Sequence, residues 1–265
     1  MKRLRIAIYD FTDCEGCEVR LCSLRERLLD LESRFDIVNW RLAQKACSEG
    51  PYDVTIIEGT PVAGAEIALL KELREKSRMI VTLGACASIA GVPGIMDGAE
   101  REKWYKKIYG PGYRPRGVDA LPVSAYVRVD YLIHGCPVDE DELVRVLEEI
   151  AAGKTPRYRG YSVCLECREA GNPCRLRNDR ICSGPITQGG CKAVCVSGGS
   201  ACYGCFGLRE DGNIDGLVRI LRWFATPSEI RGHLSMFFNR IPEYREAFEK
   251  ALKKRREARR DDDKR

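Results

Sequence analysis

The sequence predicts an α/β protein, because apolar runs of strand length alternate with helical patterns over roughly the first 150 residues. These runs have the composition of strands that are buried on both faces, which is typical of a parallel sheet. A second observation is that fourteen of the 265 residues are cysteine, and eight of them lie between residues 164 and 205. The chain is therefore expected to consist of a parallel α/β sheet followed by a cysteine-rich region.

The first strand is expected at residues 4–9, where "LRIAIY" follows a short basic start. A helix is expected at residues 18–31, since apolar side chains recur there on broadly one side. The remaining strands are expected at residues 36–41, 53–58, 79–83 and 129–133, and the remaining helices at 64–76, 101–109 and 139–152. The last helix carries acids in its first turn, where the helix dipole favours them. This order predicts a flavodoxin-like open parallel sheet over residues 1–153.

The chain changes character after residue 153. Between residues 164 and 205 it has eight cysteines, two prolines and glycine-rich pieces such as "TQGGC", with few apolar side chains for a core. Such a segment needs cross-links, and metal clusters supply them. Helical patterns return at residues 214–224 and 227–254. We expect a flavodoxin-like domain at 1–153, an irregular cluster-binding domain at 154–212, and C-terminal helices with a charged tail at 213–265.

Composition excludes several classes of protein. No apolar stretch approaches the roughly 20 residues of a membrane-spanning helix, and "MKRLRIAIYD" is too short for a signal peptide, which predicts a cytoplasmic protein. Cysteines in a reducing compartment favour metal binding over disulfides, although hyperthermophiles are an exception. The formal charge of +5 treats cysteines as neutral. If twelve of the cysteines bind three iron–sulfur clusters, as argued below, their thiolates add negative charge and the cluster cores return part of it as positive charge. The net charge of the cluster-bound protein would then be close to zero, so we expect no nucleic-acid partner.

Cysteines follow three of the predicted strands at the point where each strand ends. Cys14 and Cys17 follow the first strand, Cys86 lies in "GAC" after the fourth, and Cys136 lies in "HGCP" after the fifth. The carboxyl ends of parallel strands share one edge of a sheet, so four thiols are expected to converge there. Four thiolates suit zinc or a [4Fe–4S] cluster. One local pair with two distant single cysteines favours the cluster.

Two alternatives concern the first cysteines. Cys14 and Cys17 alone also fit a thioredoxin-like dithiol, but that interpretation leaves Cys86 and Cys136 unused at neighbouring strand ends. Cys22 and Cys47 are expected to be plain thiols, because Cys22 lies five residues beyond Cys17 in the predicted helix and points away from the edge.

The eight later cysteines fit two further sites with four thiolates each. The simplest division is sequential, with the first four and the last four forming one site each: Cys164, Cys167, Cys174, Cys182; and Cys191, Cys195, Cys202, Cys205. An interleaved division, as in two-cluster ferredoxins, is the alternative, although the ferredoxin spacing is absent. The chain has no phosphate-binding Walker loop, and its two histidines, His134 and His233, are expected to be structural. Three clusters without a nucleotide motif predict an electron relay.

Seven pieces of the sequence together resemble the small subunits of cytoplasmic nickel–iron hydrogenases. They are "DCEGCE", "IIEGTP", "GACA", "HGCP", "VCLECR", "CSGPITQGGC" and "CYGC", and they span Cys14 to Cys205. The resemblance is greatest to the delta subunit of sulfhydrogenases and to the gamma subunit of F420-non-reducing hydrogenase. It implies three [4Fe–4S] clusters, a nickel–iron large subunit as partner, and flavin or iron–sulfur subunits as electron acceptors. The hydropathy of the chain predicts no membrane segment.

The resemblance also implies an order for the clusters. The proximal group, nearest the large subunit, is Cys14, Cys17, Cys86 and Cys136; the distal group is Cys164, Cys167, Cys174 and Cys182; the medial group is Cys191, Cys195, Cys202 and Cys205. Glu18 and Glu58 match acidic positions near the proximal cluster. Val138 and Lys192 depart from the family pattern without removing a ligand, and Lys192 is expected to raise the medial cluster's potential.

Two other functions fit parts of the sequence. The quinone-module subunit of complex I shares the α/β fold but has a single cluster and adjacent cysteines, so the eight later cysteines disfavour it. A stand-alone iron–sulfur carrier or a zinc-binding structural protein is the other alternative. Iron and acid-labile sulfide distinguish a cluster protein from a zinc protein.

Overall fold

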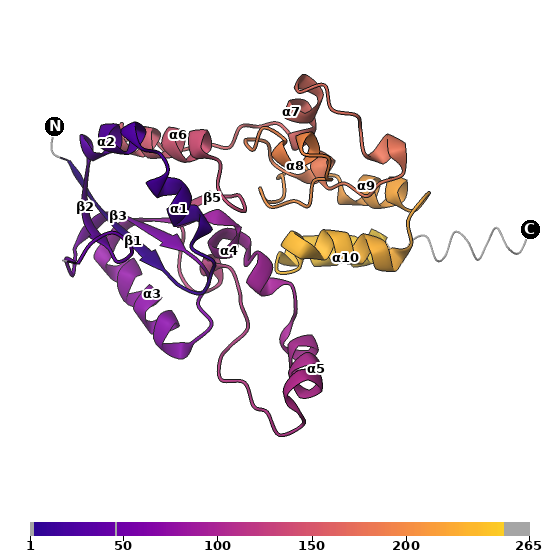
Figure 1. Ribbon diagram of the computed structural model, residues 1–265, viewed down its shortest axis with the longest axis horizontal. Coiled ribbons are helices and arrows are strands. Elements are labelled where there is room, and N and C mark those ends of the chain that lie inside the picture. Colours follow the sequence, from indigo (N-terminus) through magenta and orange to yellow (C-terminus); the bar gives the residue numbers. More distant parts are fainter. Residues whose placement is uncertain (1–2, 46, 252–265) are drawn as a thin grey trace, which may run out of the picture. The chain divides into compact units, whose positions relative to one another are not determined.

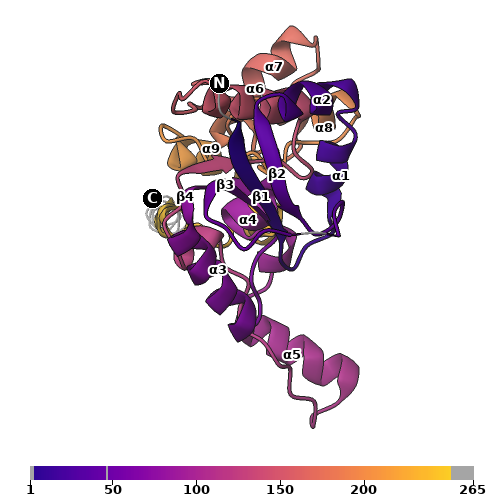
Figure 2. The same ribbon diagram turned by 90° about the vertical axis from the view of Figure 1, so that its left-hand side faces the viewer.

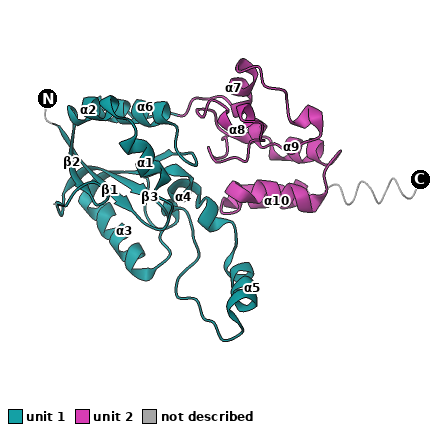
Figure 3. Cartoon of the chain, viewed as in Figure 1, with its two compact units in different colours: residues 1–157 teal, residues 158–265 magenta. Residues whose placement is uncertain are grey.

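The computed structural model describes residues 3–45 and 47–251, and the chain divides into two compact units, residues 1–157 and 158–265 (Figure 3). Unit 1 contains the predicted sheet. Unit 2 contains the later cysteines and the C-terminal helices. The boundaries predicted at residues 153 and 212 stay predictions.

Unit 1 is built on a five-stranded, wholly parallel sheet with the order β2-β1-β3-β4-β5. Figure 1 shows the sheet among its helices, and Figure 2 shows β2, β1, β3 and β4 in this order. The strands are β1 (Leu4–Asp10), β2 (Phe35–Trp40), β3 (Tyr52–Glu58), β4 (Ser77–Leu83) and β5 (Tyr131–Ile133). This is the strand order of flavodoxin-like doubly wound folds, so the predicted fold class is confirmed. The order reverses beside β1, between β1 and β3, which places the loop after β1 at the switch point where such folds bind ligands.

Helices cover both faces of the sheet. The helices of unit 1 are α1 (Gly16–Cys22), α2 (Glu26–Glu32), α3 (Gly64–Lys76), α4 (Gly84–Ile89), α5 (Gly98–Tyr109) and α6 (Glu140–Ala151). One apolar core joins α1, α2 and α6 to side chains such as Ile56, and a second core joins α3 and α4 to the opposite face. Helix α5 has no buried residue and lies away from the sheet (Figure 2).

The helix predicted at residues 18–31 is two helices, because the chain turns at residues 23–25. Arg25 has a φ of 54°, a conformation that cannot continue an α-helix. The apolar periodicity predicts the helical content but not this turn. The turn allows Leu21 on α1 and Leu31 on α2 to reach the same core.

Unit 2 contains only short elements before its last helices. The short helices are α7 (Val163–Glu169) and α8 (Val194–Ser197). The last helices are α9 (Ile214–Leu221), α10 (Pro227–Phe238) and a further helix over residues 242–251. The helix predicted at 227–254 is interrupted at residues 239–241, just before Pro242, where a proline disfavours helical geometry in the residue before it. Residues 252–254 lie outside the described residues.

Two small cores hold unit 2 together. One packs α9, α10 and the last helix around Leu217, Leu234 and Phe238. The other contains Val163, Val196, and two of the cysteines themselves, Cys182 and Cys202. Over the described part of the chain, no helix has the length and apolar character needed to cross a bilayer.

Candidate metal centres

The proximal group is assembled by the segments that follow three strands of the sheet, β1, β4 and β5. Cys14 and Cys17 lie in the loop and first turn after β1, Cys86 lies in α4 directly after β4, and Cys136 follows β5. The last two segments are tied together by the Ala85 N–H, which donates to the Gly135 carbonyl at 2.7 Å. None of the four cysteines forms a disulfide.

The four thiols are close enough to influence one another's pKa. The pKa of Cys86 is raised to about 12, first by burial and then by the charges of Cys136, Asp13 and Cys14. Burial is also the main cause of the raised pKa of Cys17, and Cys86 adds to it. Cys17 is buried, Cys86 is half-buried, and Cys14 and Cys136 are exposed. The structure therefore brings the four predicted residues to one edge of the sheet, with one thiol inside and two outside.

Glycines leave room beside two of these sulfur atoms. Gly84 has a φ of +84°, and a Cβ atom added there would lie 2.4 Å from the Cys17 Sγ. A Cβ atom on Gly16 would lie 3.2 Å from the Cys14 Sγ. At Gly84, only glycine permits this backbone conformation and this close approach without displacing a thiol.

A buried carboxylate anchors the Cys17 turn. Glu58, the last residue of β3, accepts hydrogen bonds from the Cys17 N–H at 2.9 Å and the Glu18 N–H at 2.6 Å. Glu18 accepts one from the Trp40 indole at 2.6 Å, while its Oε1 is buried without a hydrogen-bond partner. The pKa values of both glutamates are raised to about 7, chiefly by burial. Trp40 has no sequence signal that links it to this site; the acids were anticipated only through the resemblance.

The distal group gathers around α7. The pKa of Cys164 is raised to about 11 by burial and then by Cys182 and Cys167, with a smaller contribution from Cys174. A Cβ atom on Gly184 would lie 3.2 Å from the Cys164 Sγ and 3.6 Å from the Cys182 Sγ. The first four of the later cysteines are therefore neighbours in space.

In the medial group, the electrostatic interactions link Cys191 with Cys195 and Cys202 with Cys205. Cys195 is one cause of the raised pKa of Cys191, and Cys205 is one cause of the raised pKa of Cys202, with burial the largest cause for both. Cys202 also touches the distal group, because its N–H donates to the Cys182 Sγ at 3.4 Å. The division between the two groups remains a prediction.

The chemistry of the donors fits iron–sulfur clusters. All three groups consist of thiols, the ligands that such clusters use. Among residues 3–45 and 47–251, no three His, Cys, Asp or Glu side chains surround one point closely enough to hold a single metal ion. Cluster thiolates bind separate irons at the corners of a cube, so their sulfur atoms need not meet at one point.

The remaining candidates lie outside these groups. Cys22 and Cys47 are exposed thiols. His134 is buried, and burial lowers its pKa to about 4, so it is neutral at pH 7. His233 stacks on Tyr203 with ring centres 4.3 Å apart, and its Nε2 lies 2.9 Å from the Cys202 carbonyl oxygen. This position of His233 against a medial cysteine was not expected from the sequence.

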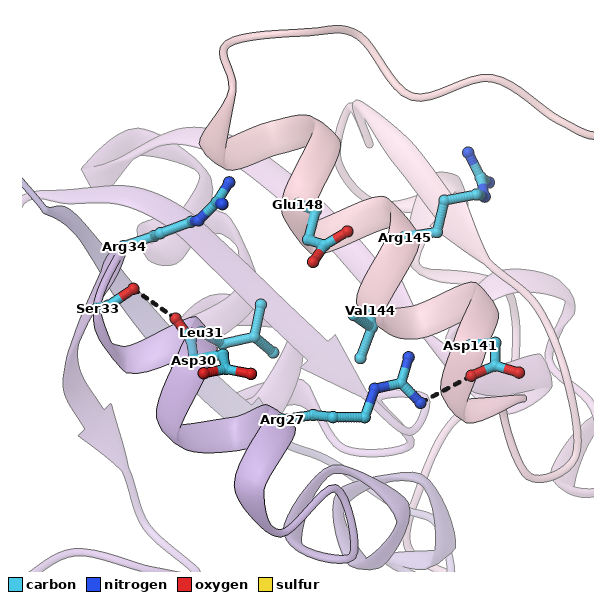
Figure 4. Close-up of a pocket in the computed structure, with 9 residues that line it drawn as sticks. All are labelled: Arg27, Asp30, Leu31, Ser33, Arg34, Asp141, Val144, Arg145 and Glu148. Carbon is cyan, nitrogen blue, oxygen red and sulfur yellow. Dashed lines mark hydrogen bonds and ion pairs between the residues drawn. The ribbon is translucent and has the colours of Figure 1, made fainter.

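A polar pocket between α2 and α6 is not a candidate centre. It is lined by nine residues, none of them cysteine (Figure 4). Its arginines alternate with acids, and Arg27 forms an ion pair with Asp141 at 2.7 Å. The balance of charge gives no preference for an anion or a cation.

Comparison with known proteins finds similarity over both units. The family model described as "NADH ubiquinone oxidoreductase, 20 Kd subunit" matches residues 14–150. Sulfhydrogenase 2 subunit delta of Pyrococcus furiosus is 35% identical over 236 residues, which are 88% of this chain and 99% of that protein. A subunit of the F420-non-reducing hydrogenase vhu of Methanococcus voltae is 27% identical, and the match covers 79% of this chain and 84% of that protein.

A solved structure shares the fold. The reduced, active form of the Ni-Fe-Se hydrogenase from Desulfomicrobium baculatum matches with a TM-score of 0.54 and 16% identity. The match covers 83% of this chain and 99% of that chain. At this identity the likeness concerns the fold alone. The sulfhydrogenase and F420-non-reducing hydrogenase subunits are the relatives that the seven sequence pieces predict.

Proposed function

Because the chain belongs to the NADH ubiquinone oxidoreductase 20 Kd subunit family and to the small subunits of nickel–iron hydrogenases, we propose that it relays electrons through three [4Fe–4S] clusters. The electrons would pass between the H2-reacting nickel–iron large subunit and a flavin or iron–sulfur partner in the cytoplasm. The clusters would supply one-electron chemistry when bound, and in this proposal H2 reacts on the large subunit.

The single observation that carries the proposal is the convergence of Cys14, Cys17, Cys86 and Cys136 at the strand ends. A relay needs a site that is held rigidly and partly shielded from water, because reorganisation around the site slows electron transfer. The Glu58 carboxylate holds the Cys17 turn against the sheet, and the core beneath it excludes water from one side. The exposed Cys14 and Cys136 leave the other side open to a partner.

The later cysteines extend the relay in this proposal. Cys164, Cys167, Cys174 and Cys182 would hold the distal cluster, and Cys191, Cys195, Cys202 and Cys205 the medial cluster. The hydrogen bond from the Cys202 N–H to the Cys182 Sγ supports the proposal, because it brings a member of each group within 3.4 Å. Electron tunnelling falls steeply with distance, so ligand sets in contact favour rapid transfer between their clusters.

One observation favours a second candidate, the quinone-module subunit of a complex I-type oxidoreductase. The matching family model is named for that subunit. The match, however, ends at residue 150, before the first of the eight later cysteines. That candidate leaves all eight without a role.

Metal analysis of the chain, purified under anaerobic conditions with its natural partners, tests the proposal. We expect about twelve irons and as many acid-labile sulfides in this chain from three four-iron clusters, beyond the iron that the partner subunits contribute, with nickel in a separate co-purifying chain. About four irons per chain and no nickel would favour the quinone-module alternative. Zinc without sulfide would overturn both.

A further inference from the structure

Glu166 lies in one group of cysteines and reaches toward another. It lies between Cys164 and Cys167 on α7, yet its carboxylate contacts the start of the medial group. Its Oε1 accepts hydrogen bonds from the Gly190 N–H at 2.9 Å and from the Tyr161 hydroxyl at 3.4 Å. Its Oε2 lies 3.8 Å from the Cys191 Sγ.

The carboxylate is held in this position rather than moving freely in solvent. Glu166 is half-buried, and its two donors come from different segments, Tyr161 before α7 and Gly190 after the distal group. Burial and then the Glu166 charge are the two largest causes of the raised pKa of Cys191, which is about 12. The charge therefore acts on this sulfur through a medium poorer in water than the surface.

We propose that the Glu166 carboxylate lowers the reduction potential of the cluster bound by Cys191, and that it also positions that ligand through Gly190. This inference rests on the proposed function, because it takes Cys191 as a cluster ligand. Reduction adds one electron to the cluster and breaks no bond. A fixed negative charge beside a ligand sulfur makes that electron less stable, and low polarity strengthens the effect.

The effect has a clear use in a relay. A cluster that binds its electron too tightly traps it and slows the next transfer. Lys192, the neighbour of Cys191 in the chain, carries the opposite charge, which acts to raise the potential. Glu166 opposes that effect from a separate helix. Because it lies between the two ligand cysteines of α7, the same residue places the charge at a defined point between the distal and medial groups.

The substitution Glu166→Gln tests the charge alone. The amide oxygen still accepts from the Gly190 N–H, but the negative charge is lost, and the amide N–H can donate to sulfur, which also favours reduction. In the purified complex with all its subunits, a redox titration followed by electron paramagnetic resonance should include three reduction steps from this chain, beside those of the partner subunits. We expect the reduction potential of one step to rise by about 59 mV or more. For one electron, this is a tenfold change in the equilibrium constant for reduction.

Two further variants make the result specific. Glu169→Gln removes the same charge from the same helix at an exposed position that does not contact Cys191, so no step should move. Cys195→Ser changes one ligand of the medial group and thereby identifies which step belongs to that cluster. Glu166→Ala should move the same step and also lower iron retention during buffer exchange, because Gly190 loses its acceptor.

Three outcomes overturn the inference. The first is an unmoved medial step in Glu166→Gln with all three clusters present, which leaves the proposed function intact. The second is an equal shift in Glu169→Gln, which shows a general effect of helix charge. The third is a complex without iron and sulfide at these cysteines, which overturns the proposed function together with this inference.

Discussion

The proximal group and the two later groups are held in different ways. The proximal cysteines lie after the strand ends of unit 1, and one of them, Cys17, joins a large core that also contains fully buried side chains of the sheet such as Ile56 and Leu83. In unit 2, Cys182 and Cys202 are members of the small core that joins α7 to α8. In the proposed function, a cluster would therefore be an addition to a stable sheet in unit 1, whereas in unit 2 two of the ligands would form part of a small core.

This difference shows how one chain can combine two kinds of stability. Strand ends present ligands from a scaffold that hydrophobic burial stabilises by itself. A segment with few apolar residues and no sheet depends on its cross-links, as small metal domains do. Loss of metal should therefore separate the two regions.

The largest expected effect follows iron removal. Chelation under reducing conditions should abolish protection from hydrogen exchange over residues 161–207, while the strands of unit 1 keep theirs, because two of the proposed ligands are part of the small core of the first region. Hydrogen exchange followed by mass spectrometry resolves the two regions. Equal loss of protection in β1, β3 and β4 would contradict the comparison.

The next effect is the loss of one cluster in unit 1 without loss of its fold. Gly84→Ala places a methyl group 2.4 Å from the Cys17 Sγ and strains a backbone with a φ of +84°. We expect the iron content to fall by about four per chain, with the circular dichroism of the sheet retained.

Gly64→Ala is the matched control for that experiment. Gly64 is the first residue of α3, and an added Cβ atom meets nothing within 4 Å. Its iron content should equal that of the wild type. An equal loss of iron in both variants would show that the close approach of Gly84 to Cys17 is unimportant.

A smaller effect tests the stability of unit 1 itself. Ile56 is fully buried in β3, so Ile56→Ala should lower the free energy of unfolding by about 2–5 kcal/mol. Denaturant unfolding followed by tryptophan fluorescence reports on unit 1, because Trp40 is buried while Trp104 and Trp223 are exposed.

Leu29→Ala provides the reference for this measurement. Leu29 is 64% exposed on α2, so its removal should change the unfolding free energy by no more than about 0.5 kcal/mol. A similar cost for both variants would mean that the sheet core is not what stabilises unit 1.

The smallest expected effect concerns the cysteines outside the three groups. Cys22→Ser and Cys47→Ser should leave iron and sulfide content unchanged, because both thiols are exposed and take no part in the contacts that define the groups. Cys86→Ser, measured beside them, should lower the iron content. A loss of iron in Cys22→Ser would require a different ligand set for the proximal cluster.

Local patterns in the sequence determined the elements of the sheet and the residues at its strand ends. Apolar runs predict strands because burial on both faces requires continuous apolar side chains, and this reasoning locates all five strands within a few residues. The position of Cys86 and Cys136 at one edge follows from parallel strand direction alone. Local patterns also predict that the later segment needs cross-links.

Only the tertiary structure decided which polar groups meet. Glu58 accepts a hydrogen bond from the Cys17 N–H, and Glu18 accepts one from the Trp40 indole. Glu166 lies between two cysteines of the distal group, yet its carboxylate contacts Cys191 of the medial group. The turn at Arg25, which divides the predicted helix in two, was likewise visible only in the structure. Hydrophobic periodicity is a property of neighbouring residues and can be seen in the sequence, whereas a hydrogen-bond partner is chosen by the packing of segments that are far apart in the chain.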